Sequence, residues 1–587
     1  MIHGARSFTN EVLRYSKNMF WQTSGSQLKS NTSQMSASNR INVKVQQGTV
    51  SGVRLQLPNG GEAFAFRGIP YAKPPIGELR HKPPQPLDKF REPVLDCAVE
   101  RDVCYSKNLF TQKMEGSENC LFLNVYTPRL PSDGKPIPVM VFIHGGAFMY
   151  GSGNSDCYSP EYFLQEGVII VTCNYRLSTL GFLYLPSQGI EGNLGLKDQL
   201  MALKWVSENI THFGGDPNNV TLFGESAGGV SVHLHLLSPR SHQYFHKAIC
   251  QSGCSNMEWA MQLNPEEKAR TLAKLVGCKG ENDADAYKTL MTASTEDLVG
   301  QMMKVLSNDE RLRGLPMPFK PVVESENATD AVVTKPPLEA MKTPNSIPNI
   351  PLMLGANNRE GTIMLLDAIK KLDVYDKDLT GLIPRTVNVK PNTLASRELA
   401  EEIKKFYFGE KSVCMETLPQ LANLMGDYHF VIFTNFCAEL HARYQHQSPL
   451  FYYNFCFDGM LNMYKKVLNL NVPGACHADE LSYQFLFRIA PIEVAADSLE
   501  ARVRYYMCRM WTNFAKHGNP TPADDTSLPF HWDPVVHIDP NSRQEFELNC
   551  LNIDEKPWMI KNPDKDRIDF WRRVYKRYND DRLKIKL

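Results

Sequence analysis

Short runs of apolar residues recur along the chain, and stretches of mixed polarity separate them. The runs are rich in β-branched and aromatic residues and are too short for helices, which predicts strands buried on both faces. A longer pattern at residues 196–213 has apolar positions at helical spacing. Because strand and helix patterns alternate, we expect an α/β protein with a mostly parallel central sheet flanked by helices. The predicted strands lie at residues 139–143, 168–174, 220–223, 248–251, 350–354 and 451–455.

The alternation predicts one folded unit. Residues 43–575 contain no low-complexity linker, so we expect a single α/β domain there, preceded by a leader at 1–42 and followed by a basic tail at 576–587. Two polar, charged insertions at 266–313 and 369–427 predict helical additions that form the walls of a gorge. In parallel sheets the site lies at the carboxyl ends of the strands.

The leader is basic and rich in serine, with Glu11 as its single acid, and it lacks the apolar core of a secretory signal. Three interpretations stay open: a mitochondrial transit peptide, a disordered tail, or an amphipathic segment that contacts a membrane or lipid droplet. We therefore expect an intracellular protein, cytoplasmic or peripheral at a membrane, with a mitochondrial location open and secretion not expected. No apolar stretch reaches the roughly 18 residues of a membrane span.

Charge and cysteine content narrow the function classes. The chain has 64 basic and 64 acidic residues, so its balance gives no reason to expect a nucleic-acid partner. Its 14 cysteines are scattered without a CxxC pair or a Cys/His ligand spacing. We therefore expect small-molecule substrates, no metal site and no cofactor.

The strongest chemical signal is the sequence Gly224-Glu225-Ser226-Ala227-Gly228. It follows a predicted strand and precedes a small-residue, helix-compatible run, which is the strand, GxSxG and helix order of a nucleophile elbow. The glycines allow a sharp turn in which larger side chains would collide with neighbouring elements. We therefore predict that Ser226 is an exposed nucleophile.

A nucleophilic serine also needs donors for the oxyanion that develops on the substrate. A second predicted strand ends in His144-Gly145-Gly146-Ala147-Phe148, a turn whose backbone N–H groups can point inward. We expect Gly145, Gly146 and Ala147 to form the oxyanion hole together with the amide of Ala227. His144 heads this turn and is interpreted as a structural hydrogen-bonding residue.

The base and the acid should follow the serine in the order acid, then histidine. His477 lies in a small-residue loop beyond the strand at 451–455, and Glu360 follows the strand at 350–354. Asp479 is a rival acid from composition alone, but its position two residues from His477 favours a loop-stabilising role. The other downstream histidines lie in helical patterns and are interpreted as surface or core-edge residues: His429, His441, His446 and His517.

At these residues the chain resembles the type-B carboxylesterases, the family that also contains the cholinesterases and the non-catalytic neuroligins. The resemblance spans about residues 43–571 and is most similar to the insect alpha-esterases. It is carried by the triad sequences above and by further motifs: Phe66-Arg67-Gly68-Ile69-Pro70-Tyr71-Ala72, Ser117-Glu118-Asn119-Cys120-Leu121-Phe122-Leu123-Asn124-Val125-Tyr126, Phe213-Gly214-Gly215-Asp216-Pro217 and His477-Ala478-Asp479-Glu480-Leu481.

The resemblance implies an α/β-hydrolase fold and several further roles. It places Trp259 and Phe148 at the substrate pocket, Glu225 and Ser252 behind the triad, and a disulfide between Cys104 and Cys120. The loop between these cysteines lacks the tryptophan with which cholinesterases hold choline, so an acetylcholine role is disfavoured.

The predicted function is therefore a serine carboxylesterase for small to medium, mostly uncharged esters. It would act through an acyl-serine intermediate and be sensitive to organophosphates, as in detoxification. Two alternatives stay open at this stage: a neutral-lipid or acylglycerol lipase at a membrane surface, and a non-catalytic neuroligin-like binding protein.

Overall fold

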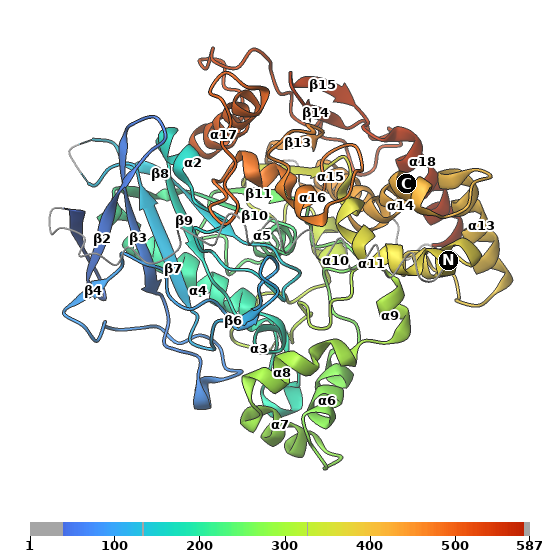
Figure 1. The fold of residues 1–587 in the computed structure, drawn as a ribbon, viewed down its shortest axis with the longest axis horizontal. Coiled ribbons are helices and arrows are strands. Elements are labelled where there is room, and N and C mark those ends of the chain that lie inside the picture. The colour runs from blue at the N-terminus through green and yellow to red at the C-terminus, as the bar shows by residue number, and fades with distance from the viewer. Residues whose placement is uncertain (1–38, 132–133, 326, 446, 580–587) are drawn as a thin grey trace.

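A long twisted sheet runs through the molecule (Figure 1) in the computed structural model, which describes residues 39–131, 134–325, 327–445 and 447–579. The strand order is β1-β2-β3-β7-β9-β8-β10-β11-β12-β13-β14-β15, with β4 beside β2. The strands are β1 Arg40–Val45, β2 Gly48–Gln56, β3 Glu62–Pro70, β4 Val94–Asp96, β7 Phe122–Thr127, β8 Ile137–Ile143, β9 Ile169–Cys173, β10 Gly215–Glu225, β11 Lys247–Gln251, β12 Leu352–Asn357, β13 Leu450–Phe455, β14 Asn549–Ile553 and β15 Trp558–Lys561.

The middle of this sheet is parallel. Neighbouring strands from β9 through β8, β10, β11, β12 and β13 to β14 all pair in parallel, whereas the β1–β2, β2–β3, β3–β7, β7–β9 and β14–β15 pairs are antiparallel. The six predicted strands correspond to β8 through β13, so the prediction of a mostly parallel central sheet is confirmed.

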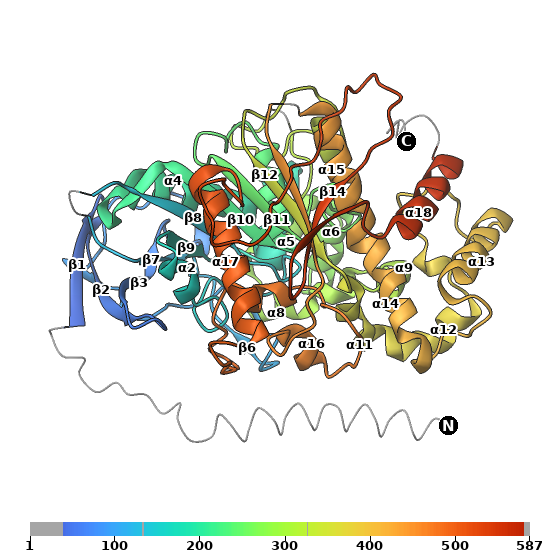
Figure 2. The same cartoon turned by 90° about the horizontal axis from the view of Figure 1, so that it is seen from above.

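Successive side chains of the central strands enter two separate apolar layers. Val141 and Leu222 belong to the layer that contains α4 and α5, whereas Phe142 and Phe223 belong to the layer that contains α2 and α17. Figure 2 shows α17 and α4 on opposite sides of the sheet. Both faces are therefore covered, which explains why these strands are continuous apolar runs in the sequence. The covering helices are α2 Glu161–Gln165, α4 Leu194–Asn209, α5 Ala227–Leu236, α15 Ile432–Tyr444 and α17 Leu499–His517.

The two predicted insertions are helical and lie away from the sheet. In Figure 1 the first insertion forms the group of helices at the bottom of the molecule. The second insertion lies beside α18 at the right of the same view. The first contains α6 Pro265–Leu275, α7 Asp283–Thr292, α8 Thr295–Gln301 and α9 Asn308–Leu312. The second contains α12 Leu372–Lys377, α13 Leu394–Phe408 and α14 Leu418–Gly426. Shorter helices are α3 Ser178–Phe182, α10 Pro337–Lys342, α11 Leu365–Ala368 and α16 Met463–Leu468.

The ordered elements extend past the boundaries expected from the sequence. β1 begins at Arg40, inside the predicted leader, because its residues pair with β2. The helix α18 (Lys565–Tyr578) continues into the predicted tail because Val574 and Tyr575 are buried in the core. Residues 1–38 of the leader and 580–587 of the tail lie outside the described residues.

Candidate active site

Ser226 lies in a strained turn between β10 and α5. Its backbone has φ 57° and ψ −121°, a combination that residues with side chains seldom adopt. A Cβ atom on Gly228 would lie 2.0 Å from the Ile143 carbonyl oxygen, and one on Gly224 would lie 2.6 Å from the same oxygen. Only glycine therefore lets α5 begin this close to β8, as the GxSxG sequence predicts, and the turn presents Ser226 to a cavity.

His477 and Glu360 form a buried pair beside this turn. His477 Nδ1 is 2.5 Å from Glu360 Oε2, so this nitrogen carries the proton and donates to the carboxylate. The other carboxylate oxygen of Glu360 accepts from the Ser252 hydroxyl at 2.6 Å and from the Asn357 N–H at 2.6 Å. These bonds fix the orientation of Glu360 and hence the tautomer of His477.

Glu225 is the second carboxylate at His477. Its Oε1 atom lies 3.0 Å from His477 Nε2, and within the described residues the Ser226 hydroxyl makes no hydrogen bond. Burial raises the pKa of Glu225 to about 8. Burial by itself would lower the pKa of His477, but the carboxylates of Glu225 and Glu360 raise it to about 9. His477 therefore keeps its proton to a higher pH than a solvated histidine, and Glu225 to a higher pH than a solvated carboxyl group.

The turn after β8 has free backbone donors. Gly146 has φ 106° and Ala147 has φ 58°, and a Cβ on Gly146 would lie 2.3 Å from the Tyr150 carbonyl oxygen. Among the described residues, the N–H groups of Gly146 and Ala147 donate to no protein acceptor. Ala227 is the first residue of α5, so its N–H has no acceptor within the helix. His144 is fully buried and stacks on Tyr175, in agreement with a structural role.

These groups open into one gorge. Its walls are mostly apolar and aromatic, and they come from segments at the edges of the two insertions. The small hairpin of β5 (Ser106–Lys107) and β6 (Met114–Glu115) forms a further wall. The wall side chains include Leu109, Phe110, Tyr150, Tyr158, Leu315, Met317, Ile363, Phe430 and Tyr464.

Two residues expected at the pocket do not line it. Trp259 lies behind Phe430, with ring centroids 5.7 Å apart, and its indole N–H donates to the His429 carbonyl oxygen. Phe148 is fully buried and packs against Phe182. The wall position is taken by Phe430, whose ring is 4.4 Å from that of His477. Phe430 belongs to a π-helical turn, Asp427–Val431, and the sequence pattern did not reveal its position.

The supporting shell contains one residue that sequence reasoning missed. Glu480 is fully buried and accepts from the amides of Asn357 at 2.6 Å and Gln251 at 3.0 Å. Asp479 accepts from the Cys476 N–H at 2.8 Å and from the N–H of Tyr464 at 2.9 Å, so it stabilises its loop as expected. The sequence placed Glu480 next to Asp479 but carried no signal for its contacts with other strands.

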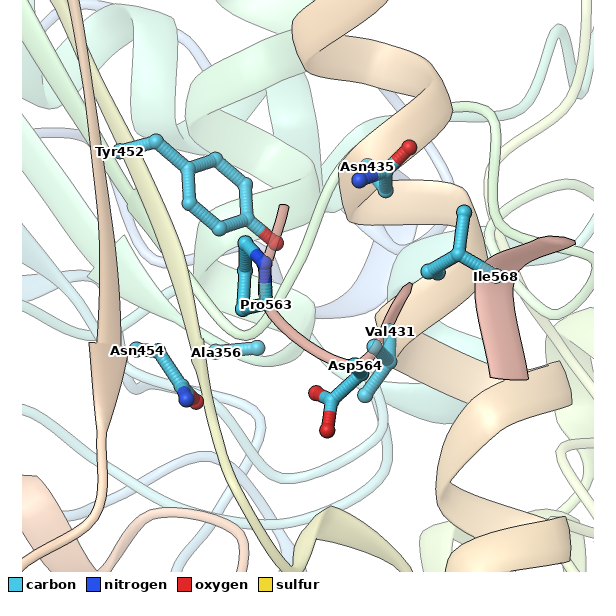
Figure 3. A pocket seen from close by; sticks show the side chains of 8 residues that line it. All are labelled: Ala356, Val431, Asn435, Tyr452, Asn454, Pro563, Asp564 and Ile568. Carbon is cyan, nitrogen blue, oxygen red and sulfur yellow. The ribbon is translucent and has the colours of Figure 1, made fainter. Parts of the chain in front are cut away.

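The base of the β5–β6 hairpin is closed by a disulfide between Cys104 and Cys120, the pair that the family resemblance implied. A second pocket, with room for about one water molecule, lies elsewhere, between β12, β13, α15 and α18 (Figure 3). Its lining includes Tyr452, Asn454 and Asp564 and none of the predicted site residues.

Comparison with known proteins decides the family. Residues 39–571 match the model of the carboxylesterase family. The chain belongs to the carboxylesterase family. It is 32% identical to Esterase B1 of Culex pipiens over 91% of this chain and 98% of that protein. It is 34% identical to the juvenile hormone esterase of Tribolium castaneum over 90% of this chain and 93% of that protein.

A solved structure agrees with this assignment. The juvenile hormone esterase of Manduca sexta, solved with OTFP covalently attached, has a TM-score of 0.79 and 30% identity, and the match covers 92% of this chain and 100% of that chain. The carboxylesterase described here therefore has the predicted α/β-hydrolase fold and is a carboxylic-ester hydrolase. The resemblance to a family of insect esterases is confirmed, and the lipase and neuroligin-like alternatives are not favoured.

The expected intracellular location is wrong. The relatives include insect esterases such as the juvenile hormone esterases, which are secreted enzymes. The Cys104–Cys120 disulfide agrees with this correction, because disulfides persist in oxidising compartments. The expectation rested on a leader of which residues 1–38 lie outside the described residues. Within the described residues, no helix is long and apolar enough to cross a membrane.

Proposed function

We propose that this carboxylesterase hydrolyses neutral, mostly apolar esters by transferring the acyl group to Ser226. The observation that carries the proposal is the convergence of Ser226, His477 and the free N–H groups of Gly146 and Ala147 on one gorge. A strained serine beside an oriented imidazole and unpaired amide donors is the arrangement that acyl transfer requires.

The proposed reaction has two similar steps. His477, oriented by Glu360, removes the hydroxyl proton of Ser226 as the Ser226 oxygen attacks the ester carbonyl carbon. The amides of Gly146, Ala147 and Ala227 hold the oxyanion, and the protonated His477 then gives its proton to the departing alcohol. Water repeats the sequence on the acyl-serine and releases the acid. For the first step His477 must turn its Nε2 from Glu225 toward Ser226, because Nε2 lies 3.0 Å from Glu225 in the resting arrangement.

The lining of the gorge supports neutral substrates. Among the described residues it includes no lysine and no arginine, whereas the carboxylates of Glu115, Asp156 and Glu225 line it. An anionic ester would lose its hydration without gaining a cationic partner, so we expect it to be rejected. The relatives include both an Esterase B1 and juvenile hormone esterases. We therefore propose neutral, mostly apolar esters as a class and no single compound as the substrate.

The first test is hydrolysis of p-nitrophenyl esters from acetate to octanoate by wild type and by Ser226→Ala. The variant should lose about 10⁴-fold or more of kcat, because no nucleophile remains. Ser152→Ala changes another serine of the gorge lining and should keep most of the activity. Paraoxon should phosphorylate the Ser226 peptide with the loss of activity. If Ser226→Ala were as active as wild type, the proposed nucleophile would be wrong.

A further inference from the structure

One Asn-X-Ser/Thr sequence of the chain lies at the tip of an exposed loop. Such a sequence is an acceptor for N-linked glycans when X is not proline. The chain has four of them, which begin at Asn31, Asn209, Asn219 and Asn327. Asn31 lies outside the described residues, so the structure distinguishes among the other three.

Asn209 is closed to modification in the folded chain. It is fully buried at the end of α4. Its side-chain N–H donates to the Trp205 carbonyl oxygen at 3.0 Å, and its side-chain oxygen accepts from the Gln46 N–H at 3.0 Å. A sugar on this nitrogen would have to occupy the close-packed core, so the folded protein should have Asn209 unmodified.

Asn219 is held within the central sheet. It is half-buried in β10, which pairs with β8 and β11, and its side-chain oxygen accepts from the Lys247 ammonium group. Thr221, the third residue of this acceptor sequence, is fully buried in the same strand. A central strand of a sheet that is covered on both faces offers little access to an enzyme, so we expect Asn219 to be unmodified as well.

Asn327 has the opposite surroundings. Asn327 and Thr329 are both exposed, and within the described part of the chain neither side chain makes a hydrogen bond. Their loop is anchored below its tip, because the Glu324 N–H donates to the Val333 carbonyl oxygen at 2.7 Å. The Arg240 side chain also donates to the Thr329 carbonyl oxygen at 2.7 Å. The loop therefore presents the acceptor amide to solvent without local unfolding.

We propose that Asn327 carries an N-linked glycan. In the transfer, the side-chain nitrogen of Asn327 bonds to C1 of the first N-acetylglucosamine of a lipid-linked oligosaccharide diphosphate. The bond between C1 and the diphosphate oxygen breaks, the lipid diphosphate leaves, and the nitrogen loses one proton. The secreted relatives and the Cys104–Cys120 disulfide support the proposal, because glycan transfer and disulfide formation take place in the same oxidising compartment.

Peptide mass spectrometry tests the proposal on the full chain produced in insect cells. Enzymatic removal of the glycans in heavy-oxygen water converts a glycosylated asparagine into labelled aspartate, so each acceptor is identified separately. The Asn327 peptide should be labelled in most wild-type chains, whereas the Asn209 and Asn219 peptides should be unlabelled. Thr329→Ala should lose the label at Asn327 although the acceptor amide is still present. Thr329→Ser, which keeps the hydroxyl group, should retain the label.

Hydrolysis of p-nitrophenyl butyrate is the second readout. Thr329→Ala should keep the wild-type kcat/KM, because none of residues 327–331 lines the gorge. Retained hydrolysis shows that the variant is folded, so the loss of the glycan is separated from a loss of structure. Unlabelled Asn327 in wild type, recovered from the medium or from the cells, would overturn the proposal. A label at Asn209 or Asn219 in the folded protein would also contradict it.

Discussion

At the scale of single residues, the protonation of His477 is set by its two carboxylate neighbours. Glu360 holds Nδ1, and Glu225 lies 3.0 Å from Nε2. The two carboxylates raise the pKa of His477 to about 9 although burial opposes this. His477 can act as a base only when it is neutral, so hydrolysis should increase as the pH rises through this range.

Glu225→Gln should shift this pH dependence. The substitution keeps the side-chain volume and removes a negative charge, so the pKa of His477 falls and the acid limb of kcat/KM moves to lower pH by about one unit or more. The measurement is the pH profile of kcat/KM with p-nitrophenyl butyrate. Glu115→Gln is the control, because Glu115 lies on the β5–β6 hairpin and bonds Asn108. An acid limb that stays in place or moves upward in Glu225→Gln would contradict the electrostatic account.

At the scale of elements, the tight turn at Ser226 depends on the close approach of α5 to the end of β8. The space for a side chain at position 228 is filled by the backbone of Ile143 at 2.0 Å. The strain at Ser226 persists because β10 and α5 are both packed into the core on either side of it.

Gly228→Ala should therefore destabilise the fold strongly, because α5 has to move away from the backbone of β8. We expect a loss of several kcal/mol in the free energy of unfolding, or failure to fold, with loss of hydrolysis. Gly300→Ala is the matched control: it lies in α8, and no atom lies within 4 Å of the added Cβ. That variant should be neutral or stabilised by about 0.5–1 kcal/mol in urea unfolding. Equal stability of the two variants would contradict the packing argument.

The π-helical turn Asp427–Val431 is a second element with a local role, because it aims Phe430 at His477. Phe430→Ala should enlarge the gorge beside His477 and shift the preferred p-nitrophenyl ester to longer chains. We expect the ratio of octanoate to acetate kcat/KM to change about tenfold or more. Trp259→Phe, which alters the ring behind Phe430, should leave the ratio near that of wild type. The reverse result would restore Trp259 as the pocket residue.

At the scale of the whole molecule, the gorge is assembled from distant segments around a rigid sheet. One wall, the β5–β6 hairpin, has little secondary structure of its own and is held at its base by the Cys104–Cys120 disulfide. Phe110 of this hairpin contacts Phe487 and Tyr464, which lie more than 350 residues later in the chain. The hairpin is therefore fixed by one covalent link and a few ring contacts.

Cys104→Ser should lower the free energy of unfolding by about 2–4 kcal/mol, because the disulfide closes a loop with a sequence separation of 16. A loosened hairpin should raise KM more than it lowers kcat. Urea unfolding and ester kinetics measure the two effects. Cys278→Ser, at a free cysteine, should leave both unchanged. If Cys104→Ser matched wild type in stability and KM, the hairpin would not depend on the disulfide.

The sequence by itself determined the parallel core of the sheet and the strand-turn-helix around Ser226. Apolar runs buried on both faces and the glycines of a tight turn are local requirements, so they can be seen in the order of residues. His477 and Glu360 were found because chain order and small-residue loops after strands limited the choice. The pairing of these two residues in the structure agrees with that choice.

Only the tertiary structure decided which side chains form the wall and the supporting shell of the gorge. Phe430, and not Trp259, lines the wall, and it belongs to a π-helical turn that hydrophobic periodicity does not reveal. His429 and His441, expected at the surface or core edge, are buried because their helices pack on both sides. The contacts of Glu480 join residues far apart in sequence. Contacts of this kind depend on how the elements pack together, and no local pattern encodes them.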